Sequence, residues 1–409
     1  MQVYLVGGAV RDRLLGRPVS ERDWVVVGAT PAELERNGYI AVGRDFPVFL
    51  HPQSKEEHAL ARLERKVAPG YRGFATEFSP DVTLEDDLRR RDLTINAMAE
   101  DREGNVIDPY GGQRDLEARL LRHVSPAFVE DPVRILRVAR FAARYADLGF
   151  RVADETLVLM QRMVADGEAA ALVPERVWVE TEKALGEPRP EVFVEVLRAC
   201  GALRVIYPEV DALFGVPQPE KWHPEVDTGV HQLMALRQAV RLGANTVTRF
   251  AVLMHDLGKG VTPPDVLPSH HGHEDAGVAL VEKLAARLRI PNHFRELAVM
   301  TSRYHTHVHR AHELRAATVL RTLEGCDALR RPERFADFLL ACESDARGRL
   351  GLEERPYPER ESFQRAREAA SAVNLPEADR EGLTGEQIGE SLRKRRIAAI
   401  EAIAKPPKP

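Results

Sequence analysis

The sequence predicts an α+β protein in which a mixed sheet with helices is followed by a wholly helical remainder. Short apolar runs alternate with helix-like spacing over residues 2–124, as in an α/β or α+β domain. From Asp131 onward the spacing stays helical. Eleven of the fourteen histidines lie between His223 and His312, a clustering that needs a chemical explanation of its own. We predict four parts: a head at 1–124, a helical neck and body at 125–222, a histidine-rich helical domain at 223–350, and a charged helical tail at 351–409.

Composition sets the broad class. With 409 residues and 44% hydrophobic content, the chain can bury the cores of two or more domains. It has no apolar run of bilayer-spanning length and no signal peptide, so we expect a cytoplasmic protein with no membrane partner. The net charge of −5 argues against binding a polyanion over the whole surface but allows a local basic groove. Cys200, Cys326 and Cys342 lack metal-binding spacing, and we expect them to be buried.

A glycine turn between two strands is the first feature with chemical content. Gln2–Val6 is expected to be a strand, and Gly7-Gly8 then lets the backbone turn sharply and approach a ligand closely. A helix is expected over Val10–Leu15. The unbroken apolar run at Asp23–Val27 predicts a second strand that is buried on both faces.

Two carboxylates stand at the start of that second strand. Side chains two apart on an extended backbone share a face, so Glu21 and Asp23 should lie side by side, across from the glycine turn. Such a pair can bridge two Mg²⁺ ions and stabilise a phosphoryl displacement. From these residues alone, a simple turn and a solvated acidic pair are the more ordinary explanation.

The rest of the head continues the alternation. Phe46–His51 and Ala59–Glu64 are expected to be strands, and Glu64 is either a third acidic group near the metals or part of a surface ion pair. The stretch 70–80 has no helical or strand period and is expected to be a mobile loop beside the site. Thr83 should cap the helix that follows.

Arginines recur in two places. Arg89, Arg90 and Arg91 are consecutive, and a triphosphate requires the bidentate donors that arginine supplies, although such runs are more often solvated. A helix that starts at Asp131-Pro132 carries Arg134, Arg137 and Arg140 as a slowly turning cationic stripe. Without the upstream motifs, an amphipathic helix with a solvent-exposed basic face would be the preferred interpretation.

Asp131 and Arg134 together offer the hydrogen-bond acceptor and donor that recognition of a nucleotide base requires. Cytosine and adenine each present an amino donor beside a ring-nitrogen acceptor, and a carboxylate beside a guanidinium can meet both. Guanine and uracil would leave polar groups unpaired. If Asp131 also caps its helix, one oxygen must serve the backbone and the other the base. Arg176, near the start of a later helix with Trp178, is a candidate RNA contact.

The histidine-rich region has the ligand types of a metal site. His255-Asp256 ends an apolar helix, and imidazole with carboxylate suits Ni²⁺, Co²⁺ or Mn²⁺, any of which can lower the pKa of a bound water. His231, His255 and Asp256 are the expected ligands. Lys259 should either bind a substrate phosphate or only interact with the helix end. The remaining ligand positions stay open among His270, His271, His273, His305 and Asp345, whereas His307, His309 and His312 are expected at the surface.

These motifs in this order resemble a known family. Gly7 to Asp12 reads GGAVRD, an acidic pair precedes a buried strand, Arg90-Arg91-Asp92 follows, and residues 130–134 read EDPVR. Together they resemble the bacterial class II CCA-adding enzymes, which are tRNA nucleotidyltransferases of the polymerase-β-like superfamily. The histidine-rich region resembles the HD phosphohydrolase superfamily. An appended HD domain is similar to the branch of CCA-adding enzymes found in Escherichia-type bacteria.

The resemblance implies a polymerase-β-like nucleotidyltransferase head, an all-α neck and body, and an all-α HD domain. It implies template-independent addition of C, C and A to the tRNA 3′ end from CTP and ATP, and hydrolysis of phosphomonoesters and 2′,3′-cyclic phosphates by the HD domain. Partners would be tRNA, CTP and ATP, and the protein would be a monomer or homodimer. By resemblance, Mg²⁺ is held by Glu21 and Asp23, and the nucleotide is bound by Gly8, Arg11, Arg91, Asp131, Arg134, Arg137 and Arg140; the HD metal is held by His231, His255, Asp256, His305 and Asp345.

One departure from the family pattern concerns the first metal position, where the family has Asp and this chain has Glu21. The extra methylene moves the carboxylate oxygens by a distance on the scale that changes catalytic rates. We expect an active enzyme with altered rate or metal preference.

Three alternatives remain at this stage. A bacterial poly(A) polymerase shares the catalytic half but should carry a longer basic tail and no histidine cluster. The polymerase half could also only bind tRNA while the HD half works. A non-catalytic RNA-binding or chaperone role is the third alternative.

Overall fold

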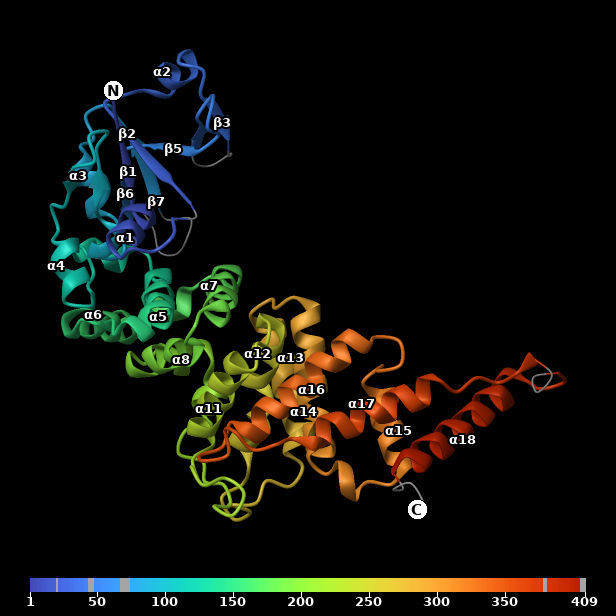
Figure 1. Cartoon of the computed structure of the whole chain (residues 1–409). Coiled ribbons are helices and arrows are strands. Elements are labelled where there is room, and N and C mark those ends of the chain that lie inside the picture. Colours follow the sequence, from blue (N-terminus) through green and yellow to red (C-terminus); the bar gives the residue numbers. More distant parts are fainter. Residues whose placement is uncertain (20, 43–47, 67–73, 378–380, 405–409) are drawn as a thin grey trace. The chain divides into compact units, whose positions relative to one another are not determined.

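The computed structural model describes residues 1–19, 21–42, 48–66, 74–377 and 381–404 (Figure 1). The chain divides into two compact units, residues 1–206 and 207–409, and each is described by itself.

A seven-stranded sheet forms the core of the first unit. Its strand order is β3-β4-β5-β2-β1-β8-β9, with β1 (Gln2–Val6) antiparallel to β2 (Asp23–Val27) and β2 parallel to β5 (Glu57–Leu60). Val25 packs with one hydrophobic cluster and Val26 with another, so both faces of β2 are buried, as predicted. The other strands of this sheet are β3 (Ile40–Val42), β4 (Val48–Leu50), β8 (Ala99–Glu100) and β9 (Val106–Ile107).

Short helices flank this sheet, and their starts follow from capping chemistry. Thr30 and Thr83 each accept a side-chain hydrogen bond from the backbone N–H three residues later. In return, the Glu33 and Asp86 side chains accept from the backbone N–H of Thr30 and Thr83. The cap predicted at Thr83 is therefore confirmed. The helices are α1 (Gly8–Leu14), α2 (Pro31–Arg36), α3 (Leu84–Arg89) and α4 (Gly112–Glu117).

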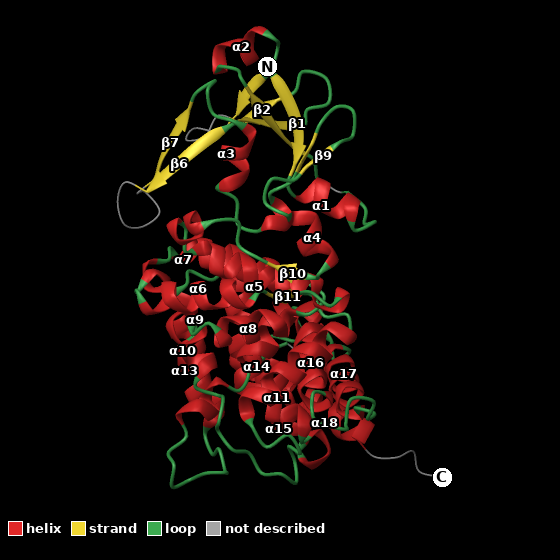
Figure 2. Cartoon of the chain, turned by 90° about the vertical axis from the view of Figure 1, so that its left-hand side faces the viewer, coloured by secondary structure: helices red, strands yellow, loops and turns green. Residues whose placement is uncertain are grey.

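Two sequence predictions in the head are wrong. The single strand expected over Ala59–Glu64 is divided, because Ala61 N–H donates to the Val26 carbonyl oxygen and the chain then leaves the large sheet. It continues as β6 (Arg62–Lys66), which pairs with β7 (Phe74–Phe78) in a separate two-stranded sheet (Figure 2). The loop expected over 70–80 is thus a strand at 74–78. Residues 67–73 and the Glu64 side chain lie outside what the structure describes.

Helices complete the first unit. The central one is α5 (Val133–Tyr145), which is buried along most of its length and packs against α7 (Pro174–Gly186) and α8 (Pro190–Ala199). The others are α6 (Asp154–Ala165) and α9 (Ala202–Ile206). The chain thus becomes mainly helical where the sequence predicts the change, except that the two-residue strand β11 (Arg151–Val152) pairs with β10 (Leu120–Leu121).

The second unit is helical throughout its described residues. Its core is formed by α11 (Thr228–Arg241), α12 (Thr246–Met254), α14 (Asn292–His309) and α16 (Pro332–Arg347), which pack against one another. Cys326 and Cys342 are buried here, and Cys200 is buried in the first unit, as predicted. Every helix in the described part of the chain is too short or too polar to cross a bilayer. The remaining helices are α10 (Pro208–Asp211), α13 (His273–Arg287), α15 (Ala316–Gly325), α17 (Pro358–Ser371) and α18 (Gly385–Ala404).

Candidate active sites

The first candidate site is a polar cavity of about 780 Å³ in the first unit. It gathers the glycine turn, the acidic pair and the arginines of α5, although these lie more than a hundred residues apart in sequence. Every nucleotide or Mg²⁺ residue predicted from the sequence lines this one cavity: Gly8, Arg11, Glu21, Asp23, Arg91, Asp131, Arg134, Arg137 and Arg140.

The acidic pair lies across from the glycine turn. Asp23 is directly opposite Val6 in the antiparallel ladder, and Val6 is followed at once by Gly7. Asp23 is solvent-accessible, but partial desolvation by the cavity walls raises its pKa; the Arg91 guanidinium opposes this rise and the Glu21 carboxylate adds to it. The two carboxylates are therefore close enough to repel each other, which is the electrostatic situation that a divalent cation relieves.

Gly7 is required by the geometry of the turn. Its φ of 69° and ψ of −125° are strained for a residue with a side chain, and a Cβ there would lie 2.8 Å from Nη1 of Arg91. At Gly8 a Cβ would meet Arg11 Nη2 at 3.4 Å, a tight but less severe contact. The absent side chain of Gly7 is thus what lets the Arg91 guanidinium lie against the turn.

Buried carboxylates hold the arginines in place. Asp87 is fully buried and pairs with Nη2 of Arg90 at 2.8 Å and with Nη2 of Arg91 at 3.3 Å. Asp92 accepts from Nε of Arg137 at 2.7 Å. Burial would raise the pKa of Asp92, but Arg137 and the hydrogen bonds to the carboxylate outweigh it and hold the pKa well below its ordinary value.

Arg11 and Arg140 lie deeper in the wall. Arg11 is 3% exposed and donates to both oxygens of Asp12, while its guanidinium stacks on the ring of Tyr145 at 5.2 Å. Arg140 donates from Nε to Glu180 at 2.7 Å. Both therefore have structural partners in addition to their place in the cavity wall.

Asp131 is held by a residue other than the one expected. Arg176 on α7 donates from Nη1 and Nη2 to its two oxygens at 3.0 and 2.7 Å, and Val133 N–H caps onto the same carboxylate at 3.2 Å. Arg134 instead donates from Nη1 and Nη2 to the carbonyl oxygens of Ala127 and Arg90. The carboxylate and guanidinium that the sequence pairs for base recognition are thus anchored separately.

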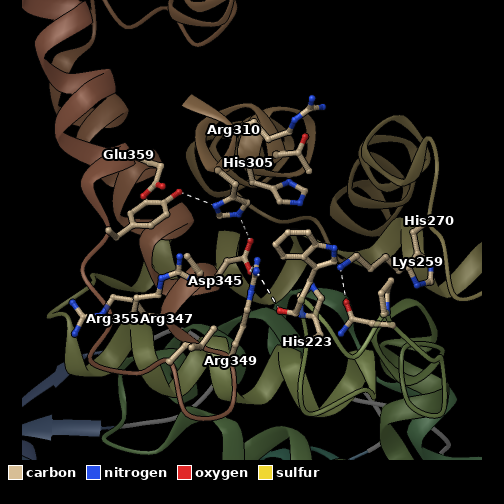
Figure 3. A pocket seen from close by; sticks show the side chains of 18 of the residues that line it. His223, Lys259, His270, His305, Arg310, Asp345, Arg347, Arg349, Arg355 and Glu359 are labelled. Carbon is tan, nitrogen blue, oxygen red and sulfur yellow. Dashed lines mark hydrogen bonds and ion pairs between the residues drawn. The ribbon is translucent and has the colours of Figure 1, made fainter. Parts of the chain in front are cut away.

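The second candidate site is a cavity of about 510 Å³ in the second unit (Figure 3). Asp345 and His305 point toward its middle, and Arg347, Arg349 and Arg355 lie along one side. Lys259 and His270 lie on the other side. A cationic wall around a carboxylate and imidazole centre suits a phosphate-bearing ligand.

All five predicted HD ligands are buried and gather at this centre. His231 on α11, His255 and Asp256 after α12, His305 on α14 and Asp345 on α16 belong to overlapping groups whose ligand atoms lie within 4.8 Å of one another. His231 Nε2 is 3.1 Å from Asp345 Oδ1, and His255 Nε2 is 3.1 Å from Asp256 Oδ2.

A backbone oxygen fixes which nitrogen of His255 faces inward. His255 Nδ1 lies 2.7 Å from the Val252 carbonyl oxygen, and His231 Nδ1 lies 2.9 Å from Glu225 Oε1. Because a carbonyl oxygen can only accept, Nδ1 of His255 carries a proton, and its Nε2 is the nitrogen that faces the other ligand atoms. Among the described side chains, His255 Nε2 and Asp256 Oδ1 are buried without a hydrogen-bond partner. This donor set fits a divalent transition metal.

In the centre, the negative charges of two buried aspartates are balanced by positively charged neighbours. Burial would raise the pKa values of Asp256 and Asp345, but neighbouring cations outweigh it and hold both pKa values well below the ordinary value. Lys259 Nζ lies 2.6 Å from Asp256 Oδ2 and donates to Gln218. Burial lowers the pKa of His305 well below its usual range, so its imidazole is neutral, which is the form that binds metals.

Some functional residues were missed or misplaced. The surface position expected for His309 is wrong, because its Nε2 lies 2.6 Å from Asp345 Oδ2 and its Nδ1 lies 2.8 Å from the Tyr357 hydroxyl. The signal was present, since His309 is one helical turn beyond His305 on α14 and shares its face. Glu225 and Tyr357 had no such signal, and Tyr357 lies in the part predicted as a charged helical tail.

The structure separates the histidines whose role as metal ligands the sequence left open. His273 joins the metal-binding groups with Asp256 and His305. His270 is held outside them by Thr262 and the Pro217 carbonyl oxygen, and His271 is exposed. His312 is exposed, as expected, whereas His307 is half-buried and its Nδ1 bonds to Thr322 Oγ1.

The fold and the two sites are those of a nucleotidyltransferase head joined to helices and a domain with a histidine–aspartate cluster that could hold a metal ion. Three family descriptions match in that order: "Poly A polymerase head domain" at residues 3–122, "Probable RNA and SrmB-binding site of polymerase A" at 149–214, and "HD domain" at 228–330.

Relatives identify the family. The Multifunctional CCA protein of Thioalkalivibrio sulfidiphilus is 66% identical over 98% of this chain and 98% of its own length, and that of Hahella chejuensis is 60% identical over 98% and 95%. The chain belongs to the multifunctional CCA protein family. It is therefore a tRNA nucleotidyltransferase with an HD domain, which confirms the predicted class over the poly(A) polymerase alternative.

Solved structures agree with the fold class. A CCA-adding enzyme in apo form II has a TM-score of 0.68 at 21% identity, covering 100% of this chain and 89% of that chain. A tRNA-processing enzyme solved with CTP has a TM-score of 0.59 at 25% identity, covering 99% and 97%. The α+β head followed by helical parts is thus confirmed.

Proposed function

We propose that the first unit adds C, C and A to the 3′ end of tRNA from CTP and ATP, without a nucleic-acid template. The observation that carries this proposal is the meeting of the acidic pair, the glycine turn and the arginines of α5 in one cavity. Relatives named multifunctional CCA proteins, and the tRNA-processing enzyme solved with CTP, support the same substrates.

Each group in the cavity has a role that its chemistry suits. Glu21 and Asp23 are exposed at the cavity and would hold Mg²⁺, which when bound supplies charge neutralisation at the departing pyrophosphate and lowers the pKa of the RNA 3′-hydroxyl. Arg91, kept against the turn by Gly7, would bind the triphosphate, and Arg137 and Arg140 would add further positive charge.

Base choice would depend on Asp131. Its carboxylate can accept from the exocyclic amino group of cytosine or adenine, and Arg176 orients it. A base must therefore share this carboxylate with Arg176 or take one oxygen from it. This arrangement assigns Arg176 a positioning role in selection of C and A.

The test uses α-labelled CTP and ATP with tRNA lacking its terminus, incubated with Mg²⁺. Addition limited to C, C and A supports the proposal. A long adenylate tract, or tRNA binding without incorporation, would refute it. Glu35→Gln, which removes an exposed carboxylate on α2, serves as the matched control for changes at Glu21 and Asp23.

We infer that the second unit hydrolyses phosphomonoesters and 2′,3′-cyclic phosphates, a reaction suited to repair of tRNA ends. His231, His255, Asp256, His305 and Asp345 would hold a divalent transition metal, with Ni²⁺, Co²⁺ and Mn²⁺ the ions that suit this donor set. Such an ion, when bound, supplies a hydroxide near neutral pH. The arginine wall, including Arg349, would bind the phosphate.

Hydrolysis of a 2′,3′-cyclic nucleotide by the full chain tests this second activity. We expect activity after metal loading, its loss in Asp345→Asn, and its retention in His312→Gln, which changes an exposed histidine of the same unit. Activity that survives Asp345→Asn would place the chemistry elsewhere.

A further inference from the structure

One large aromatic side chain is left exposed at the cavity of the second unit. Trp222 lines this cavity and is 58% exposed. Lys221 Nζ lies 4.7 Å from the centroid of the indole ring, and the ring keeps this exposure with Lys221 in place. The other two tryptophans of the chain, Trp24 and Trp178, are half-buried and buried. An exposed indole costs free energy that a ligand stacked on it would recover.

The segment that carries Trp222 has a fixed backbone. Residues 217–224 include three prolines, each of which restricts φ at its own position. The N–H of Gln218 donates to the Val226 carbonyl oxygen at 2.7 Å, and the N–H of Trp222 donates to the Pro219 carbonyl oxygen at 3.0 Å. The indole is therefore presented to the cavity by a connection that is hydrogen-bonded on both sides of it.

One guanidinium joins Trp222 to the centre of the cavity. Arg349 Nη1 donates to the Trp222 carbonyl oxygen at 3.4 Å, and Arg349 Nη2 donates to Asp345 Oδ1 at 3.4 Å. Gln218, four residues before Trp222, accepts from Lys259 Nζ at 2.6 Å. The Trp222 backbone and the Asp345 carboxylate are thus separated by the width of a single guanidinium. A nucleotide with its phosphate at the centre can consequently bring its base to the indole.

The cavity has the room and the lining for a nucleotide. Its volume of about 510 Å³ falls within the range of about 300–1,000 Å³ that is common for small-molecule sites. Arg349 and Arg355 lie on one side and Lys259 on the other, which suits a phosphate (Figure 3). Trp222 and Leu352 add aromatic and apolar surface, which a phosphate does not use and a nucleobase does.

We propose that Trp222 stacks on the base of a nucleotide whose phosphate lies at the histidine–aspartate centre. The second unit then selects nucleotides, including the last nucleotide of an RNA 3′ end, over phosphate esters that lack a base. Every nucleobase has an aromatic face, so this kind of contact accepts all four bases. Trp222 determines specificity without touching the reacting phosphate. The inference deepens the proposed hydrolase function and rests on it.

Two substrates with the same reacting group test the proposal. The full chain loaded with Co²⁺ is assayed with adenosine 2′,3′-cyclic phosphate and with glycerol 1,2-cyclic phosphate, which has the same five-membered phosphate ring and no base. In Trp222→Ala we expect KM for the cyclic nucleotide to rise by about 5- to 100-fold with little change in kcat, because stacking binds the ground state and the transition state alike. KM for the base-free ester should stay within about twofold.

Two further variants serve as controls. Trp222→Phe keeps an aromatic ring and should retain most of the preference for the cyclic nucleotide. Leu350→Ala removes a side chain that is 55% exposed in the same unit and lies outside the cavity lining, and it should behave as the parent. An equal loss for both substrates in Trp222→Ala would indicate a structural role and overturn the proposal. An unchanged KM for the cyclic nucleotide in Trp222→Ala would also overturn it.

Fluorescence separates this inference from the proposed function. Adenosine, which has no phosphate to hydrolyse, should quench the tryptophan emission of the full chain, and the quenching should be smaller in Trp222→Phe, which retains Trp24 and Trp178. Quenching of equal size in the two proteins would refute stacking on Trp222. A difference in quenching without hydrolysis of either ester would support the base site and refute the hydrolase function. Hydrolysis that Trp222→Ala leaves unchanged for both esters would do the reverse.

Discussion

Arg176 donates from Nη1 and Nη2 to the two carboxylate oxygens of Asp131, at 3.0 and 2.7 Å, in the wall of the polar cavity of the first unit. The two residues are 45 positions apart in sequence: Arg176 is on α7, and Asp131 lies in the short connection before α5. This ion pair replaces the Asp131–Arg134 pair that the sequence predicts. It means that the orientation of the Asp131 carboxylate, which we propose reads the base, depends on α7.

Replacing Arg176 should therefore weaken base selection. In Arg176→Ala the Asp131 carboxylate loses two charge-assisted hydrogen bonds, and we expect kcat/KM for CTP and ATP to fall about five- to tenfold, or about 1 kcal/mol for this partly exposed pair. Arg176→Lys should recover only part of the loss, because an ammonium cannot bind both oxygens in a fixed plane. Single-turnover incorporation measures both effects, and unchanged kinetics in Arg176→Ala would contradict this role.

Gly7 and Gly8 form a matched pair for testing the turn. Gly7→Ala places a Cβ 2.8 Å from Arg91 Nη1 in a strained backbone conformation, so we expect a large rise in KM for CTP and ATP and a loss of about 1–3 kcal/mol in stability. Gly8→Ala meets only the end of Arg11 at 3.4 Å and should cost much less. Steady-state kinetics and urea unfolding of both variants check this order, and equal effects would contradict it.

The Asp92–Arg137 pair predicts a pH-dependent contribution to stability. The folded state lowers the pKa of Asp92, so its contribution is present above the ordinary carboxyl pKa and is lost as the pH falls toward the folded-state value. Asp92→Asn should lower the free energy of unfolding at pH 7 by about 2 kcal/mol, since Arg137 is itself 37% exposed. In urea unfolding this difference should begin to shrink below about pH 5. A difference that stays constant down to pH 4 would argue against an ionic origin.

His309 supports the HD centre from outside. It donates to Asp345 Oδ2 from Nε2, and loss of such an outer hydrogen bond commonly costs about 10–100-fold in metal affinity. His309→Ala should therefore weaken Co²⁺ binding and 2′,3′-cyclic phosphate hydrolysis while leaving CCA addition unchanged. His307→Ala, two positions earlier on α14, is the control. Equal Co²⁺ affinity in the two variants would show that His309 does not orient Asp345.

Much of the fold could be predicted from local sequence patterns. The strand at Asp23–Val27, the cap at Thr83 and the His255-Asp256 pair after an apolar helix all depend on neighbours within a few residues, and the structure has them where the sequence predicts. The switch between sheets at Ala61 was invisible, because it depends on a hydrogen bond to Val26, thirty-five positions earlier.

Long-range partners explain what the sequence left out of the sites. Arg176 as the partner of Asp131, and Glu225 as the residue facing His231 Nδ1, are set by how distant segments pack. His273 could be named only as one of several candidates, since its distance from Asp256 depends on the close approach that Gly258 allows. Residue types thus indicated the chemistry, and packing assigned the positions.

Single-nucleotide addition of labelled CTP to tRNA lacking its terminus tests the proposed metal-binding role of Glu21 and Asp23 most directly. We compare the parent chain with Asp23→Asn, Glu21→Asp and the control Glu35→Gln, each with Mg²⁺ and with Mn²⁺. We predict an active parent, loss of incorporation by about 100-fold or more in Asp23→Asn, a changed rate or Mg²⁺-to-Mn²⁺ activity ratio in Glu21→Asp, and no change in Glu35→Gln. Incorporation by Asp23→Asn at the parental rate would contradict it.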